Sequence, residues 1–143
     1  MLKYLIAASS LAAFVFASAV PASAAGASGA PNKLVVQVSD NDPAKWNLSL
    51  NNVKNVQADL GAKNVDIEIV AYGPGIGMLK MDSPVGNRVG EALGSGVQVV
   101  ACQNTMENQK LTRADMLSRI GYVKAGVVEL MLKQQQGYAY LRP

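Results

Sequence analysis

The feature that most constrains the fold of this chain is a regular alternation of strand-like and helix-like segments after residue 32. The first segment, Lys33–Val38, is a short run rich in β-branched residues, as expected for a strand covered on both faces. A helix follows, because Asp42 suits the N-cap, Pro43 suits the first helical position and Gly61 suits the position after the last turn. Together these segments predict a β-α unit whose helix packs on a sheet.

The same alternation continues to the end of the chain. Further strands are predicted at 65–69, 97–102, 120–123 and 138–141, and further helices at 84–93, 104–110 and 126–136. A capping box at 112–115 predicts one more helix start. The alternation predicts an α/β fold, a three-layer sandwich in which a five-stranded, mostly parallel sheet lies between helices. The second strand alternates apolar residues with Asp66 and Glu68, so we expect it nearer an edge of the sheet.

Two apolar clusters bear on packing and assembly. Residues 76–81 place Ile, Met and Leu side chains in a loop, where they cover either a neighbouring subunit or the same chain. In the helix predicted at 126–136, the side chains expected to face inward are Val127, Leu130 and Met131.

The first 24 residues have the features of a cleavable signal peptide. Lys3 supplies a positive charge, residues 4–16 form an uncharged apolar run, and Ala22-Ser23-Ala24 provides the small residues of a cleavage site. The run is shorter than the roughly 20 residues of a membrane span, although an uncleaved anchor is the alternative. The predicted organisation is a signal peptide at 1–24, a flexible leader at 25–32 and one α/β domain at 33–143. It places the protein in the periplasm or outside the cell, with no membrane association after cleavage.

Composition argues against several classes of site. The 13 Lys and Arg residues, against 10 Asp and Glu, are scattered without the basic stripe of a nucleic-acid surface, so no nucleic-acid partner is expected. The sequence has no histidine, which removes Ser-His-Asp and Cys-His catalytic pairs and every zinc site that uses histidine. We expect neither a metal nor an organic cofactor. The single cysteine, Cys102, has no partner for an internal disulfide.

Cys102 falls where a parallel sheet usually binds ligands. The carboxyl ends of parallel strands share one edge, and the segments that follow the predicted strands there are 39–42, 73–77, 102–106 and 124–126. Cys102 directly precedes a predicted helix start, so backbone N–H groups around Asn104 and Thr105 would favour its thiolate. Lys124, if exposed at the same edge, would act in the same direction.

Each of these features also has a purely structural interpretation. Free cysteine is often a core residue, so Cys102 is either a packed side chain or a reactive thiol. Gly73 and Gly75 lie in a loop that either cradles an anion beside the thiol or simply turns tightly. The carboxylates of Asp40 and Asp42 would disfavour a thiolate, so residue types alone leave the direction of the pKa shift of Cys102 open.

Four segments share their order and spacing with a known family. They are the Gly-Pro-Gly loop at 73–75, VVACQNTM at 99–106, AGVVEL at 125–130 and QGYAYLRP at 136–143. This set resembles the DsrE/DsrF-like family and extends over residues 33–143. The resemblance implies a five-stranded parallel sheet between helices and a homo-oligomer, commonly a trimer or hexamer. It also implies sulfur relay, because the better-known members hold sulfane sulfur as a cysteine persulfide, and Cys102 is the matching cysteine.

The leading hypothesis combines this resemblance with the export signal. It describes an exported sulfur-binding or sulfur-transfer protein, a carrier or transferase-like activity at most, that holds sulfane sulfur as a persulfide on Cys102. The residues expected to bind the sulfur beside that thiol are Asn104, Thr105, Gly73, Gly75 and Lys124. Its partners would be polysulfide, or donor and acceptor proteins other than those of the cytoplasmic family members. The alternative is a non-catalytic oligomeric binding or assembly module with a buried structural cysteine.

Overall fold

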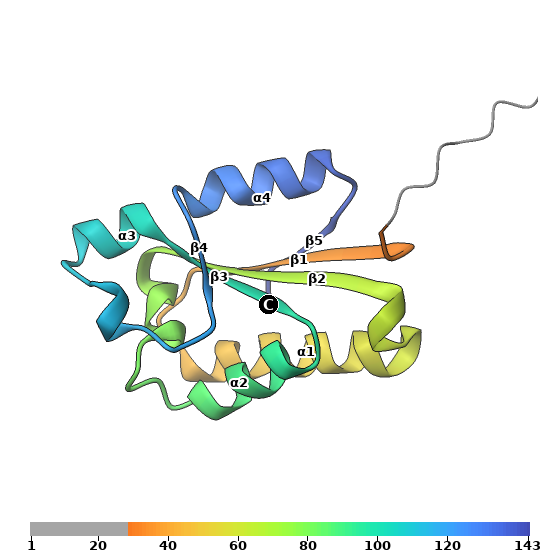
Figure 1. The fold of residues 1–143 in the computed structure, drawn as a ribbon, viewed down its shortest axis with the longest axis horizontal. Coiled ribbons are helices and arrows are strands. Elements are labelled where there is room, and N and C mark those ends of the chain that lie inside the picture. Colours follow the sequence, from red (N-terminus) through yellow and green to blue (C-terminus); the bar gives the residue numbers. More distant parts are fainter. Residues whose placement is uncertain (1–28) are drawn as a thin grey trace, which may run out of the picture.

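The computed structural model describes residues 29–143, so the predicted signal peptide and the first part of the leader lie outside the described residues. Within 29–143, no helix is both long enough and apolar enough to cross a membrane. These residues form one α/β sandwich (Figure 1).

Five parallel strands form a single sheet in the order β4-β3-β2-β1-β5. Their bounds are β1 Asn32–Val38, β2 Val65–Ala71, β3 Gln98–Cys102, β4 Gly121–Val123 and β5 Ala139–Leu141. The chain steps outward from β1 to β4 and then returns to the far side of β1 for its last strand (Figure 1). The predicted five-stranded parallel sheet is confirmed.

Helices cover both faces of this sheet, which confirms the predicted three layers. Figure 1 shows α1 and α2 on one face and α4 on the other, with α3 at the carboxyl end of β3. The bounds are α1 Pro43–Leu60, α2 Gly86–Gly94, α3 Gln103–Asn108 and α4 Gly126–Gln135. The main core lies between the sheet and α1 and α2, and a smaller cluster lies under α4.

The first helix begins and ends at the residues that the sequence indicates. The carboxylate of Asp42 accepts the backbone N–H of Ala44 at 2.8 Å, which satisfies one of the free amides of the first turn. At the other end, Gly61 adopts a φ of +86° and donates its N–H to Gln57 at 2.9 Å. A residue with a side chain is strained at that φ, which explains the glycine.

The prediction that the second strand lies nearer an edge is wrong, because β2 is the central strand. Glu68 is buried and Asp66 is half-buried, and both are paired with side chains near the C-terminus. Lys133 of α4 places its Nζ 2.9 Å from a carboxylate oxygen of Glu68, and the Tyr138 hydroxyl donates to Asp66. Acidic residues in a strand therefore predict an edge position only if their side chains face solvent and not a cation or hydroxyl of another segment.

The apolar loop packs within its own chain. Residues Gly73–Leu79 form a 3-10 helix whose Ile76, Met78 and Leu79 are almost completely buried in the main core. Met81, which follows the helix, stays 68% exposed. Burial within the subunit is therefore the correct alternative for this loop, Met81 excepted.

The capping box at 112–115 forms, but no α-helix follows it. Thr112 and Asp115 exchange the two expected hydrogen bonds around a single 3-10 turn, Arg113–Asp115. Met116 then adopts an extended backbone and forms an antiparallel bridge with Lys80, which ends the turn. Pairing with a distant segment thus overrides the local helix signal.

We predict that Gly75→Ala destabilises the fold strongly, whereas Gly90→Ala does not. A Cβ on Gly75 would lie 2.3 Å from the carbonyl oxygen of Val38, a backbone atom that cannot move aside cheaply. Such overpacking should lower the free energy of unfolding by at least about 2 kcal/mol. Gly90 lies inside α2 with nothing within 4 Å of its Cβ position, so alanine there should add up to about 1 kcal/mol. Urea unfolding checks both, and equal midpoints would contradict the packing argument.

We further predict that Lys133→Met lowers the free energy of unfolding by about 3 kcal/mol at neutral pH, because Glu68 would then be a buried carboxylate without a cation. Adding Glu68→Gln should recover most of that loss.

Burial raises the pKa of Glu68 above 4.5, although Lys133 opposes the rise. The folded state therefore binds this proton more tightly than the unfolded chain, and the deficit of Lys133→Met should shrink as the pH falls toward 4.5. A pH-independent deficit in urea unfolding would rule this account out.

Candidate functional site

Cys102 is the last residue of β3 and lies between two loops at the carboxyl edge of the sheet. In the register of the strands, Ala101 pairs with Ala71 of β2, and Cys102 itself pairs with Val123 of β4. The segment that follows β2 and the segment that follows β4 therefore flank the thiol. The topology brings together the predicted segments 73–77, 102–106 and 124–126.

The thiol is nearly buried but is held by polar groups. Cys102 is 5% exposed, and its Sγ lies 3.9 Å from the backbone carbonyl of Lys124, to which the S–H donates. The same carbonyl accepts the backbone N–H of Asn104 at 3.1 Å. The cysteine is therefore not surrounded by apolar atoms alone.

A hydroxyl group links the thiol to the glycine loop. The backbone N–H of Gly73 donates to Oγ1 of Thr105 at 2.9 Å, and Thr105 is almost buried. Because that oxygen accepts from Gly73, the hydroxyl proton is left for the sulfur of Cys102, whose pKa the Thr105 hydroxyl lowers. Gln109 donates to the carbonyl of Gly73 at 3.4 Å and helps hold the loop. The predicted residues Gly73 and Thr105 thus form one chain of hydrogen bonds with Cys102.

Opposing effects act on the pKa of Cys102, and the hydrogen bonds prevail. Burial raises the pKa, since a thiolate loses hydration there. The Thr105 hydroxyl lowers it, as do the backbone N–H groups of Gly126, Thr105 and Asn104. The net pKa lies below the ordinary value of 9.0. The arrangement favours a thiolate, which is the nucleophilic form of cysteine.

Gly126 is a site residue that the sequence reasoning did not select. It begins α4, and its backbone N–H faces the sulfur. A Cβ on Gly126 would lie 2.9 Å from the Cβ of Tyr72, so glycine lets the helix start close to the segment after β2. The sequence did offer a signal for Gly126, because it is a glycine at the start of a predicted helix that follows a strand end.

Lys124 and Gly75 lie near the site but act differently from the expectation. The ammonium of Lys124 pairs with Glu107 at 3.5 Å, both side chains are largely exposed, and the contact with the thiol is made by the backbone carbonyl. Gly75 packs against the backbone of Val38 at the end of β1, so it positions the loop rather than touching the sulfur.

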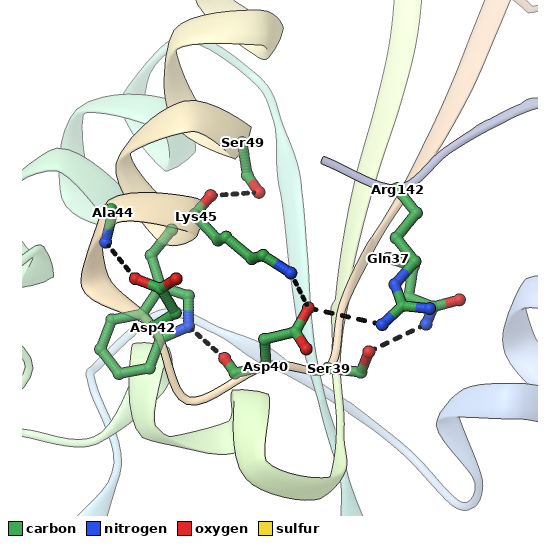
Figure 2. Close-up of polar contacts among 9 residues, drawn as sticks. Gln37, Ser39, Asp40, Asp42, Ala44, Lys45, Ser49 and Arg142 are labelled. Carbon is green, nitrogen blue, oxygen red and sulfur yellow. Dashed lines mark hydrogen bonds and ion pairs between the residues drawn. The ribbon is translucent and has the colours of Figure 1, made fainter.

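The two carboxylates expected to disfavour the thiolate are engaged with other groups (Figure 2). Asp40 lies between Lys45 at 3.0 Å and Arg142 at 3.5 Å, and the hydrogen bond from Lys45 lowers the pKa of Asp40. Asp42 caps α1 through Ala44. Figure 2 shows these groups gathered around the ends of β1 and β5. Asp40 also ties the C-terminal segment to the first turn of α1.

Among residues 29–143, no three His, Cys, Asp or Glu side chains lie close enough together to hold a metal ion.

These features define a small single-cysteine α/β domain whose thiol lies at the carboxyl edge of a parallel sheet. The chain belongs to the DsrE/DsrF-like family, because the family model matches residues 11–143. A comparison with curated proteins gives no significant match.

Solved structures show the same fold. The protein of unknown function MTH1491 from Methanobacterium thermoautotrophicum is 35% identical, with a TM-score of 0.75 over 78% of this chain and 99% of that one. The conserved protein BT1422 from Bacteroides thetaiotaomicron is 21% identical, with a TM-score of 0.67 over 82% of this chain and 100% of that one. The YchN protein from E. coli is 12% identical, with a TM-score of 0.61 over 78% and 99%. The last two establish a shared fold only.

We predict that Thr105→Val slows alkylation of Cys102 at neutral pH by on the order of tenfold, because one hydrogen bond to a charged sulfur is lost. Its pH–rate midpoint should move upward from a wild-type midpoint that lies below 9.0. Thr105→Ser keeps the hydroxyl and serves as the matched control, with a profile close to wild type. Identical profiles for the valine and serine variants would show that the hydroxyl does not act on the sulfur.

Proposed function

We propose that this protein is an exported sulfur carrier that holds sulfane sulfur as a persulfide on Cys102. The observation that carries the proposal is that polar groups around the buried sulfur lower the pKa of Cys102: the Thr105 hydroxyl first, then the backbone N–H groups of Gly126, Thr105 and Asn104. Membership of the DsrE/DsrF-like family supports it, since sulfur relay is the family's better-known activity. Such donors favour a nucleophilic thiolate, and they would also stabilise a persulfide anion.

Loading is a thiol exchange that needs no metal or organic cofactor. The thiolate of Cys102 attacks a terminal sulfur of an inorganic polysulfide and forms a new S–S bond. The neighbouring S–S bond of the polysulfide breaks, and the departing chain, one sulfur shorter, keeps the electron pair. A persulfidated donor protein reacts in the same way and leaves as its thiolate.

In unloading, the sulfur of Cys102 is the leaving group instead of the nucleophile. The thiolate of an acceptor attacks the outer sulfur of the Cys102 persulfide and takes it as its own persulfide. The Cys102 sulfur leaves with the electron pair, and the Thr105 hydroxyl and the nearby backbone N–H groups stabilise it as it becomes a thiolate again. The protein returns to its starting state, as a carrier must.

The burial of Cys102 supports a slim sulfur donor. Only 5% of this residue is exposed, so a linear polysulfide chain or an extended cysteine side chain suits the site better than a branched or bulky donor. The donor and acceptor would be found in the periplasm or outside the cell, because residues 1–24 have the charge, apolar run and small residues of a signal peptide.

The test is intact-mass spectrometry of the purified protein after incubation with inorganic polysulfide. We predict a gain of one or more sulfur atoms that dithiothreitol removes, and no gain for Cys102→Ser. Thr105→Val should load more slowly, since its thiolate is less stabilised. A Cys102→Ser variant that gains as much sulfur as the wild type would refute the proposal.

One observation favours a second candidate function, a non-catalytic binding or assembly module with a structural cysteine. Cys102 is buried in the core of the fold and is nearly inaccessible. In that case the thiol should resist alkylation until denaturant is added, and polysulfide should leave the mass of the protein unchanged. Alkylation of the folded protein at a rate governed by a thiol pKa below 9.0 would exclude the module.

A further inference from the structure

A slot between α1 and α2 lies apart from the thiol site, on the face of the sheet opposite α4. Figure 1 shows these two helices side by side, and the space between them has a volume of about 140 Å³. Each helix lines it with residues spaced i, i+3, i+4 and i+7, which share one side of a helix. The lining residues are Leu50, Val53, Lys54 and Gln57 of α1, and Arg88, Glu91, Ala92 and the C-cap Ser95 of α2.

Hydrogen bonds between the two helices close the slot at both ends. At one end the guanidinium of Arg88 donates to the side-chain oxygens of Asn47 and Asn51, at 2.5 and 2.6 Å. At the other end Gln57 donates to the carbonyl of Ser95 at 3.1 Å and accepts from its hydroxyl at 2.9 Å. The separation of the helices is therefore set by specific contacts, and the space between them is part of the fold.

The floor of the slot is apolar. Leu50 and Val53 are buried members of the main core, and the half-buried Ala92 packs against that core. Because Ala92 has only a methyl group, this position of α2 leaves room that a leucine would fill. A space of this kind accommodates about six to eight non-hydrogen atoms, since an apolar cavity of roughly 150 Å³ holds one benzene molecule.

Charged groups of both signs line the walls above this floor. Lys54 belongs to α1, and Arg88 and Glu91 lie one turn apart on α2. Within residues 29–143, none of the three takes part in an ion pair. Arg88 has five N–H donors and makes three hydrogen bonds, all to neutral oxygens of α1, so donors and a net charge remain for a ligand.

We propose that this slot binds a small aliphatic amino acid, such as valine, in its zwitterionic form. The carboxylate of the ligand would pair with Lys54 and Arg88, its ammonium with Glu91, and its side chain would cover the apolar floor. A simple carboxylate would be placed beside the like charge of Glu91, and a simple amine would meet two cations. A ligand that carries both charges therefore suits these walls best.

This inference goes beyond the proposed sulfur carriage and does not rest on it. Ser95 precedes the start of β3, whereas Cys102 is the last residue of that strand, so this end of the slot and the thiol lie at opposite edges of the sheet. Cys102→Ser should therefore bind the amino acid as the wild type does. Variants of the slot should in turn gain sulfur from polysulfide at the wild-type rate.

Isothermal titration calorimetry of the purified protein, expressed from its full sequence, with L-valine tests the site. We expect a dissociation constant of about 1 mM or lower, which is reasonable for a ligand of this size. Isobutyrate and isobutylamine each carry one of the two charges and should bind at least about tenfold more weakly. Absence of saturable valine binding would overturn the proposal, as would isobutyrate binding as tight as that of valine.

Three variants locate the ligand. Lys54→Met and Glu91→Gln should each raise the dissociation constant at least about tenfold, because each removes a hydrogen bond between charged groups. Ala92→Leu should fill the space and abolish binding. Lys63→Met is the matched control, because Lys63 is an exposed lysine in the turn after α1, outside the slot, and it should bind valine as the wild type does.

Folding of each variant is checked by its circular dichroism spectrum. Lys54 and Glu91 are exposed, so their variants should give the wild-type spectrum and a loss of binding should reflect the slot itself. Valine binding that Lys54→Met, Glu91→Gln and Ala92→Leu all retain would place the ligand elsewhere and refute the assignment. An equal loss of binding in Lys63→Met would refute it as well.

Discussion

The buried ion pair between Glu68 and Lys133 joins the centre of the sheet to the helix that completes the fold. β2 is the central strand, and Glu68 lies in its middle with almost no exposure, so the carboxylate requires a cation from the covering layer. Lys133 supplies it from the third turn of α4. The position of that helix in turn decides two other features: where the Gly126 amide meets the sulfur of Cys102, and which side chains of α4 face outward. One electrostatic requirement therefore links the core, the site and the outer surface.

Most of the architecture follows from local signals that the sequence carries openly. Asp42, Pro43 and Gly61 mark the ends of α1 because each satisfies a backbone requirement that is specific to a helix terminus. The alternation of strands and helices requires parallel pairing, and parallel pairing brings every strand end to one edge. The place of Cys102 beside the glycine loop could be predicted on that basis alone, before any contact was known.

What the sequence did not predict depends on partners that are distant along the chain. Glu68 looked like a surface residue because its counter-ion, Lys133, lies in the last helix. For the same reason Val127 and Met131, predicted to face inward with the buried Leu130, are instead 57% and 50% exposed, since hydrophobic periodicity assumes that charges face water. At the site, the charge of Lys124 suggested a role, whereas the groups that act on the sulfur are a hydroxyl and two backbone amides of α3 and one backbone amide of α4. Residue types do not show which backbone N–H groups will lie beside the sulfur, so these donors could not be predicted from the sequence.

The hydrogen bond from Gly73 to Thr105 has a consequence for the response of the site to charge. A free hydroxyl rotates, and its dipole must reorient each time a neighbouring atom gains or loses an electron pair. Here the oxygen of Thr105 is engaged by a backbone N–H, which leaves one favoured direction for the proton, toward Cys102. The local field is thus oriented before any charge forms, and the sulfur can become anionic or neutral with little reorganisation of its surroundings. The donor that fixes this direction is a main-chain amide rather than a second side chain.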